Sequence, residues 1–145
     1  MIYTELTKKA ACLAFQAHFG QTDRAGFPYI MHPIHVAEQM TTEDTCVVAL
    51  LHDVLEDTDV TAEDLRREGF TDAQIEAVKL ITHAEGTDYM DYVRGIKKNE
   101  IAKTVKLADL AHNMDRTRIR ELSEKDEARY RKYQAAKALL LEEEN

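Results

Sequence analysis

Two histidines and two aspartates lie in three segments that are otherwise rich in apolar residues. His52 and Asp53 stand near the end of one apolar run, Asp109 interrupts another, and His32 precedes a proline. Burying a charged carboxylate is costly unless it is paired or bound to a metal. A nitrogen and oxygen donor set without cysteine suits a catalytic divalent metal with open water positions, in contrast to a structural zinc site.

Each of these residues also has an ordinary structural explanation. A lone HisAsp dipeptide such as 52–53 is more often a polar helix C-terminus with one hydrogen-bonded histidine than a metal site. His32 is in a position where a residue that starts a helix is commoner than a ligand. Asp109 could form an ion pair on a helix surface with Lys106, three residues earlier, and such a pair is worth little. His35, one turn after His32, is a competing and weaker candidate ligand.

Two further carboxylates follow the histidine and aspartate pair at helical spacing. Glu56 lies four residues after His52, and Asp57 lies four residues after Asp53. Because residues four apart are neighbours on a helix surface, all four polar groups fall within about one turn. Glu56 or Asp57 could position or deprotonate a water, or protonate a leaving oxygen.

The charge of the chain restricts its ligands. Its 145 residues carry 19 Lys and Arg against 27 Asp and Glu, a net charge of −8. This disfavours a general nucleic-acid binder, whose affinity comes from neutralising phosphates. A polyphosphate would need a local basic patch or a metal. The best candidates for that patch are Arg24, Lys106, Arg116, Arg118 and Arg120, with Lys132 on the last helix as a further possibility.

Nothing in the sequence suggests a membrane or secreted protein. No apolar run approaches the roughly 20 residues that span a bilayer. Charged residues interrupt the N-terminal segment 1–9, where a signal peptide would be apolar. Cys12 and Cys46 lie in apolar helical patterns, so buried thiols are expected in preference to a disulfide. We expect a cytoplasmic protein without a membrane partner.

The elements that must position these residues are predicted to be helices. Apolar residues recur at helical spacing along the chain, and the alternation typical of strands is essentially absent. The expected bundle is all-α and compact, a single domain over residues 1–145 with about seven or eight helices. A helix opened by Thr41 is expected to continue through Val54. Polar residues also precede four later helices and suit their N-caps: Thr61, Thr71, Asn99 and Ser123.

Four segments resemble those of the HD-domain phosphohydrolases. The resemblance is closer to the hydrolase domain of the RelA/SpoT-type alarmone enzymes and to their stand-alone small alarmone hydrolases. It extends from about residue 4 to residue 140. The segments that carry it are AlaHisPheGlyGln (17–21), GlyPheProTyrIleMetHisPro (26–33), LeuLeuHisAspValLeuGluAspThr (50–58) and ValLysLeuAlaAspLeuAlaHisAsnMet (105–114).

The resemblance assigns roles to these residues. It implies an HD-domain fold in which one divalent metal, expected to be manganese, is held by His32, His52, Asp53 and Asp109. The substrate-binding residues are expected to include Arg24, Lys106, Asn113 and Arg116. Glu56 and Asp57 match the catalytic acidic pair. The implied reaction releases pyrophosphate from the 3′ position of guanosine tetra- or pentaphosphate, and no synthetase domain is expected within residues 1–145.

The chain departs from the family pattern where the base is recognised. Asp23 stands where the base-contacting arginine usually follows GlnThr, and Arg24 comes one residue later. After LeuAlaAsp the family often has a basic residue, and this chain has Leu110. After AsnMet the family usually has ArgThr; here Asp115 comes first, and the ArgThr pair follows at 116–117. Two alternatives follow. One is a nucleotidase or phosphatase with the same fold that acts on another nucleotide. The other is a non-catalytic binding protein that antagonises a nucleotide-synthesising toxin.

Overall fold

Most helices of the protein begin at polar side chains that accept hydrogen bonds from first-turn N–H groups. In the computed structural model, which describes residues 1–119 and 121–143, reciprocal capping boxes open four helices. Each cap accepts a hydrogen bond from a backbone N–H three residues later, and the side chain at that later position accepts one in return. The capping residues are Thr4, Thr61, Thr71 and Ser123.

The described residues contain nine α-helices, one short 3₁₀ helix and no strand. No described helix has the length and apolar character needed to cross a membrane. The elements in chain order are α1 (Glu5–Ala17), α2 (Met31–Glu38), α3 (Glu43–Leu51), α4 (Val54–Asp57), α5 (Ala62–Arg67), α6 (Asp72–Ile81), α7 (Tyr89–Lys97), α8 (Glu100–Asn113), η1 (Arg116–Arg118) and α9 (Glu124–Leu141).

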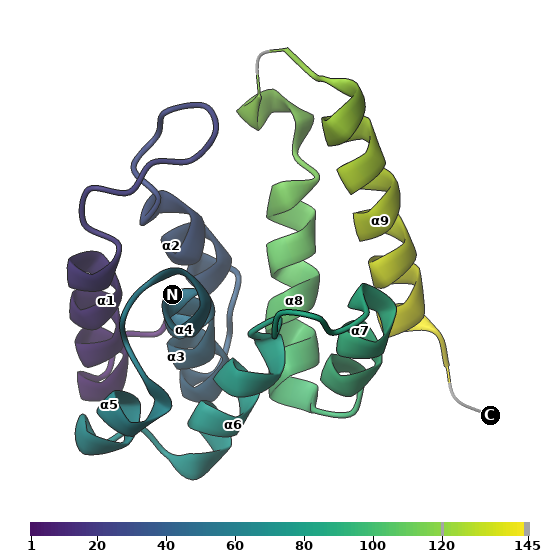
Figure 1. The fold of residues 1–145 in the computed structure, drawn as a ribbon. Helices are drawn as coiled ribbons and strands as arrows, with labels where there is room; N and C mark the ends of the chain where they lie inside the picture. Colours follow the sequence, from purple (N-terminus) through teal and green to yellow (C-terminus); the bar gives the residue numbers. More distant parts are fainter. Residues whose placement is uncertain (120, 144–145) are drawn as a thin grey trace.

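The helices form two groups that meet at α8 (Figure 1). Helix α3 is central to the first group: its residues 45–51 are all buried, and α1, α2, α6 and α8 pack around it. Helices α7 and α9 pack against α8 from the other side. The loop between α1 and α2 lies at the same end of the molecule as η1, at the top of Figure 1. This end is where segments distant in the sequence can meet.

The expected all-α bundle is confirmed, except that one predicted helix is split into two in the structure. The helix that was to run through Val54 ends at Leu51, and the separate short helix α4 follows it. At the break, His52 turns its ring back onto the carbonyl of Ala49, at 2.6 Å from Nδ1. The N-cap of α3 is Thr42 and not Thr41, because the Thr42 hydroxyl accepts from the third residue of the first turn.

The prediction of two buried thiols is correct for one of them. Cys46 is fully buried in α3, but Cys12 is exposed. Helix α1 turns Ala10 and Ala14 toward the core, and Cys12 lies between them in sequence, about 200° around the helix from each. Both cysteines are free, so neither takes part in a disulfide.

Candidate metal centre and active-site cavity

The break between α3 and α4 brings two predicted ligands to one side. His52 is the C-cap residue of α3, and Asp53 is the residue directly before α4. Their side chains converge, with His52 Nε2 3.1 Å from Asp53 Oδ2. Adjacent residues on a helix diverge by about 100°, yet the His52 ring and the Asp53 carboxylate still meet at one point.

Helices α2 and α8 supply the other two predicted ligands. His32 Nε2 lies 2.8 Å from Asp109 Oδ1 and 3.3 Å from His52 Nε2. Asp109 Oδ1 is also 3.3 Å from His52 Nε2, and Asp53 Oδ2 is 3.8 Å from His32 Nε2. The structure therefore brings together all four side chains from three segments.

These donor atoms fit a divalent metal. One atom each from His32, His52 and Asp109, all buried, lie within 4.8 Å of one another. The carboxylate of Asp53 lies at the rim of this group and accepts a 2.6 Å hydrogen bond from the Tyr29 hydroxyl. His52 donates its Nδ1 proton to a backbone carbonyl, which leaves the lone pair of Nε2 directed at the cluster. Two imidazoles and carboxylate oxygens are donors that first-row divalent metals accept.

Without a metal, the buried charges of the cluster compensate one another. Burial by itself would lower the pKa of His52, but the carboxylates of Asp53 and Asp109 outweigh burial and raise it well above its usual value. Burial would raise the pKa of Asp53, but the neighbouring His52 outweighs burial and lowers it to about 2. The protonated imidazole of His52 thus neutralises part of the negative charge of Asp53 and Asp109.

Asp109 is held as a carboxylate by its own helix. Lys106 Nζ donates to Asp109 Oδ2 at 2.8 Å, and Asn113 Nδ2 donates to Asp109 Oδ1 at 3.1 Å. Burial alone would raise the pKa of Asp109, but Lys106 and the two histidines lower it well below its usual value. The ion pair with Lys106 exists, yet both partners are buried. It is therefore part of the cluster and not the solvent-exposed surface pair that was the alternative.

The two candidate acid–base residues stand beside the cluster. Asp53, Glu56 and Asp57 form a second group of close carboxylates. Glu56 Oε1 accepts a 2.7 Å hydrogen bond from the backbone N–H of His83, which fixes one end of its side chain. Partial burial and the charges of Asp53 and Glu56 raise the pKa of Asp57. All three carboxylates line a cavity of about 210 Å³ together with His32 and Asp109.

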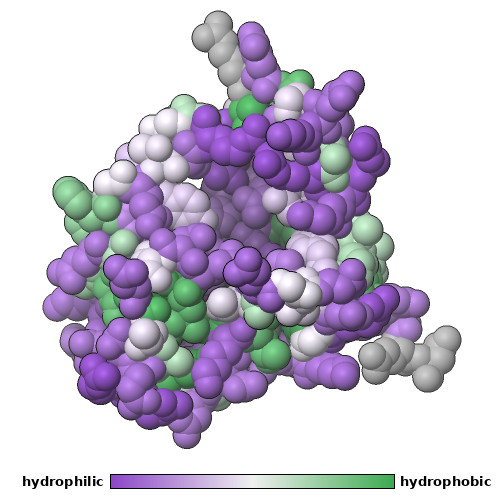
Figure 2. Space-filling model, in the orientation of Figure 1, coloured by the Kyte–Doolittle hydropathy of each residue, from purple (hydrophilic) through white to green (hydrophobic). Residues whose placement is uncertain are grey.

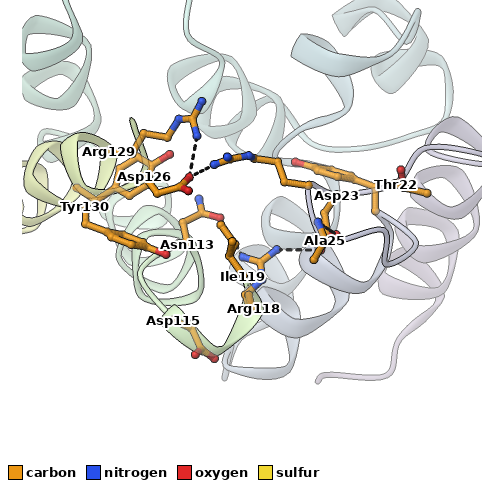
Figure 3. Close-up of a pocket in the computed structure, with 13 residues that line it drawn as sticks. Thr22, Asp23, Ala25, Asn113, Asp115, Arg118, Ile119, Asp126, Arg129 and Tyr130 are labelled. Atoms are coloured by element: carbon orange, nitrogen blue, oxygen red, sulfur yellow. Dashed lines mark hydrogen bonds and ion pairs between the residues drawn. The ribbon is translucent and has the colours of Figure 1, made fainter. Parts of the chain in front are cut away.

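A second cavity of about 290 Å³ adjoins the first, and the two have Tyr29, Asn113 and Tyr133 in common. Figure 2 shows hydrophilic residues around the hollow between the two halves of the molecule. Ion pairs between residues that line the second cavity join the α1–α2 loop to the α8–α9 region (Figure 3). They join Arg24 to Asp126 and Arg118 to Asp23, the latter at 3.6 Å.

The predicted substrate-binding residues lie in different places in the structure. Arg24 and Asn113 line the second cavity, and Lys106 lines the first, where it is already bound to Asp109. Arg116 lines neither: it forms a bidentate pair with Glu127 and covers the ring of Tyr130. Arg118 lines the second cavity. Arg120 lies outside the described residues.

Some residues of the site were not singled out from the sequence. Tyr29 hydrogen-bonds to Asp53, His112 hydrogen-bonds to His32, and Arg129 joins Arg24 on the carboxylate of Asp126. Tyr29 and His112 both lie inside segments that carry the family resemblance, which is the one signal that could have found them. The position of Arg129 depends on how α9 packs, which no local pattern encodes.

The chain is similar in sequence to known proteins. No family model matches the chain. Over 121 residues it is 31% identical to the bifunctional (p)ppGpp synthase/hydrolase SpoT of Escherichia coli, covering 74% of this chain and 17% of that protein. The chain is a homologue of the SpoT-type enzymes. This SpoT homologue is also 36% identical over 123 residues to the guanosine-3′,5′-bis(diphosphate) 3′-pyrophosphohydrolase of Borreliella burgdorferi, covering 73% of this chain and 18% of that protein.

The fold of the SpoT homologue also occurs in a solved structure. That structure is described as a metazoan ortholog of SpoT that hydrolyses ppGpp. It superimposes with a TM-score of 0.80 at 23% identity, covering 100% of this chain and 90% of the other. The fold is therefore the same. The chain spans less than a fifth of the length of the curated relatives named above.

Proposed function

We propose that this protein is a divalent-metal-dependent hydrolase that removes the 3′-pyrophosphate from (p)ppGpp-like nucleotides. The observation that carries the proposal is that two cavities adjoin, one lined by the histidine and carboxylate cluster and the other lined by arginines. The homology to 3′-pyrophosphohydrolases supports the same reaction. In this proposal residues 1–145 form one hydrolase domain, and manganese is the metal.

The cluster residues would hold the metal and orient the diphosphate. His32, His52, Asp53 and Asp109 are the proposed ligands. A divalent metal, when bound, supplies positive charge that stabilises phosphate oxygens and increases the acidity of water. The Ala49 carbonyl fixes the ring of His52, and Lys106 fixes Asp109, so these side chains need little reorganisation on binding.

Glu56 and Asp57 would move the protons of the reaction. They line the same cavity as the cluster but lie outside the buried donor set of His32, His52 and Asp109. The pKa of Asp57 is raised toward neutral pH. A carboxylate with such a pKa can take a proton from the attacking water and pass one to the leaving oxygen. Glu56, held by the N–H of His83, would position the water.

The second cavity would receive the nucleoside. Its volume of about 290 Å³ is at the lower end of ordinary small-molecule sites. Tyr29 and Tyr133 in the shared wall offer aromatic faces, and Arg24, Arg118 and Arg129 offer positive charge for a base plane or a 5′ phosphate. A nucleotide bound there would extend its 3′ group past Asn113 into the cavity of the cluster.

The proposal is tested with purified protein, manganese and a panel of 3′- and 5′-phosphorylated nucleotides, with products resolved by chromatography. We expect (p)ppGpp to lose pyrophosphate faster than nucleoside monophosphates lose phosphate, and His52→Ala and Asp109→Ala to lose both bound metal and activity. Asp59→Ala is the control, since Asp59 is exposed and lies outside the donor group and both cavities. Phosphate release from monophosphates with (p)ppGpp untouched would favour the nucleotidase alternative. Binding of (p)ppGpp without turnover would favour a non-catalytic protein.

A further inference from the structure

His112 contacts the metal-centre histidine His32 from the side opposite the donor cluster. Its Nδ1 lies 2.7 Å from Nδ1 of His32, and the two rings are within 6° of parallel with centroids 5.0 Å apart. Rings stacked face to face cannot bring atoms closer than about 3.5 Å. The two imidazoles therefore lie nearly in one plane, the geometry in which the N–H of one points at the lone pair of the other.

This pair of nitrogens shares a single proton. A hydrogen bond between two neutral imidazoles needs one N–H donor and one lone-pair acceptor. Nε2 of His32 belongs to the cluster, 2.8 Å from Asp109 Oδ1. When Nε2 of His32 binds a metal, its lone pair is used there, so the ring proton must be on Nδ1 and must be donated to His112.

The fold holds His112 in place for this contact. His35 packs flat on the ring of His112, with centroids 3.9 Å apart and an angle of 20°. Arg118 donates a hydrogen bond to the backbone carbonyl of His112 at 3.1 Å, at the end of α8. Among the described residues, His112 is the one group that hydrogen-bonds to Nδ1 of His32.

We infer that His112 is a positioning residue of the metal centre, which orients His32 and fixes its proton on Nδ1 by accepting that proton's hydrogen bond. It touches neither the metal nor the substrate. The inference rests on the proposed metal site but not on the reaction, because it concerns the affinity for the metal alone. Losing a hydrogen bond of this kind typically costs 10–100-fold in metal affinity.

The test measures Mn²⁺ affinity without nucleotide, by electron paramagnetic resonance of the free ion in competition with a chelator. His112→Phe keeps a ring for His35 to pack on but removes the acceptor, and we expect its affinity for Mn²⁺ to fall about 10–100-fold. His112→Asn places an amide oxygen near the lost Nδ1, and we expect it to stay within about threefold of the wild type. His35→Phe keeps an aromatic ring packed on His112 and should also leave the affinity unchanged.

Each outcome decides the inference. Equal affinity in the wild type and His112→Phe would overturn it while leaving the metal centre and the hydrolase proposal intact. Equal losses in His112→Phe and His112→Asn would also overturn it, since packing and not the hydrogen bond would then matter. Thermal melting of each metal-free variant shows whether it is folded. If the wild type binds no Mn²⁺, the metal site and this inference both fail.

Discussion

At the scale of single residues, the cluster combines groups that would hold a metal with groups that would move protons. The four proposed ligands are buried or lie at the rim of the buried group, whereas Glu56 and Asp57 are exposed to the cavity. This separation means that the two roles can be removed independently.

Neutralising either acidic residue should slow the reaction without emptying the site. For Glu56→Gln and Asp57→Asn we expect turnover to fall by about 10²-fold or more, because the proton transfer loses its carboxylate. Mn²⁺ affinity should change little, which the same competition assay checks. Asp59→Asn, an exposed carboxylate two residues further on and outside the cavity, is the control. Near-normal turnover in both variants would contradict the assigned role.

Arg24 should affect binding more than chemistry. It lines the second cavity, away from the proposed ligands, and is held by Asp126. We expect Arg24→Ala to raise KM for (p)ppGpp about tenfold with a smaller change in kcat. The lost contact would stabilise the bound substrate and the transition state equally. Arg94→Ala, which removes an exposed arginine paired within its own helix α7, should change neither constant. A fall in kcat at constant KM would place Arg24 in the reaction itself.

At the scale of helices, the start of α9 connects stability to the second cavity. Ser123 caps α9 and donates to Asp126 Oδ2, while Asp126 Oδ1 binds Arg24 and Arg129. The buried carboxylate of Asp126 thus joins the cap of α9 to two arginines that line the second cavity. This connection is the reason that a cap on α9 should influence substrate binding.

Removing that cap should therefore have two effects. Ser123→Ala should cost about 1 kcal/mol of stability, a fall in Tm of roughly 2–4 °C for a domain of this size. It should also raise KM, because Asp126 Oδ2 loses one of its two hydrogen bonds from Ser123 and keeps only the one from the backbone N–H. Thr61→Ala removes an equivalent cap from α5, which lines neither cavity, and should lower Tm without changing KM. Calorimetry and steady-state kinetics check both variants, and an unchanged KM in Ser123→Ala would disprove the connection.

The helices show which features of the fold can be predicted from sequence patterns and which cannot. Capping residues and apolar spacing predicted α5, α6, α8 and α9 with their starts, because these signals are local. The break after Leu51 was not predicted, because no glycine or proline marks it and His52 and Asp53 keep helical backbone angles there. The four proposed ligands could be chosen because polar groups in apolar segments are conspicuous. The pairing of Arg24 with Asp126, 102 residues away, depends on tertiary packing and left no local signal.

At the scale of the whole molecule, metal binding should be linked to both stability and pH. The cluster joins α2, α8 and the α3–α4 break, so a bound metal would cross-link segments that separate on unfolding. At a free Mn²⁺ concentration of about 100 times Kd, the folded state should gain about 2.7 kcal/mol. Chelation should lower Tm correspondingly, and a Tm that does not respond to Mn²⁺ would contradict a native metal site.

The pH dependence of metal uptake has a defined sign. In the metal-free protein the pKa of His52 is raised by Asp53 and Asp109, so its imidazole holds a proton at pH values where an ordinary histidine has lost it. A metal ligand must be neutral, so the metal has to displace that proton. Mn²⁺ affinity should therefore increase as pH rises from 6 to 8, with proton release on binding. Calorimetry in buffers of different ionisation enthalpy measures the release, and its absence at pH 7 would contradict the assignment of His52 as a ligand.

The central claim is that the protein cleaves a 3′ diphosphate as a unit. Phosphorus-31 NMR of guanosine 3′,5′-bis(diphosphate) incubated with the protein and a substoichiometric amount of Mn²⁺, with spectra taken after Mn²⁺ is removed, measures this directly. We predict that the 3′-diphosphate signals disappear while a pyrophosphate signal grows in equal amount, and that the 5′-diphosphate signals persist as those of GDP. Growth of an orthophosphate signal in place of pyrophosphate, or loss of the 5′ signals first, would contradict the proposed reaction.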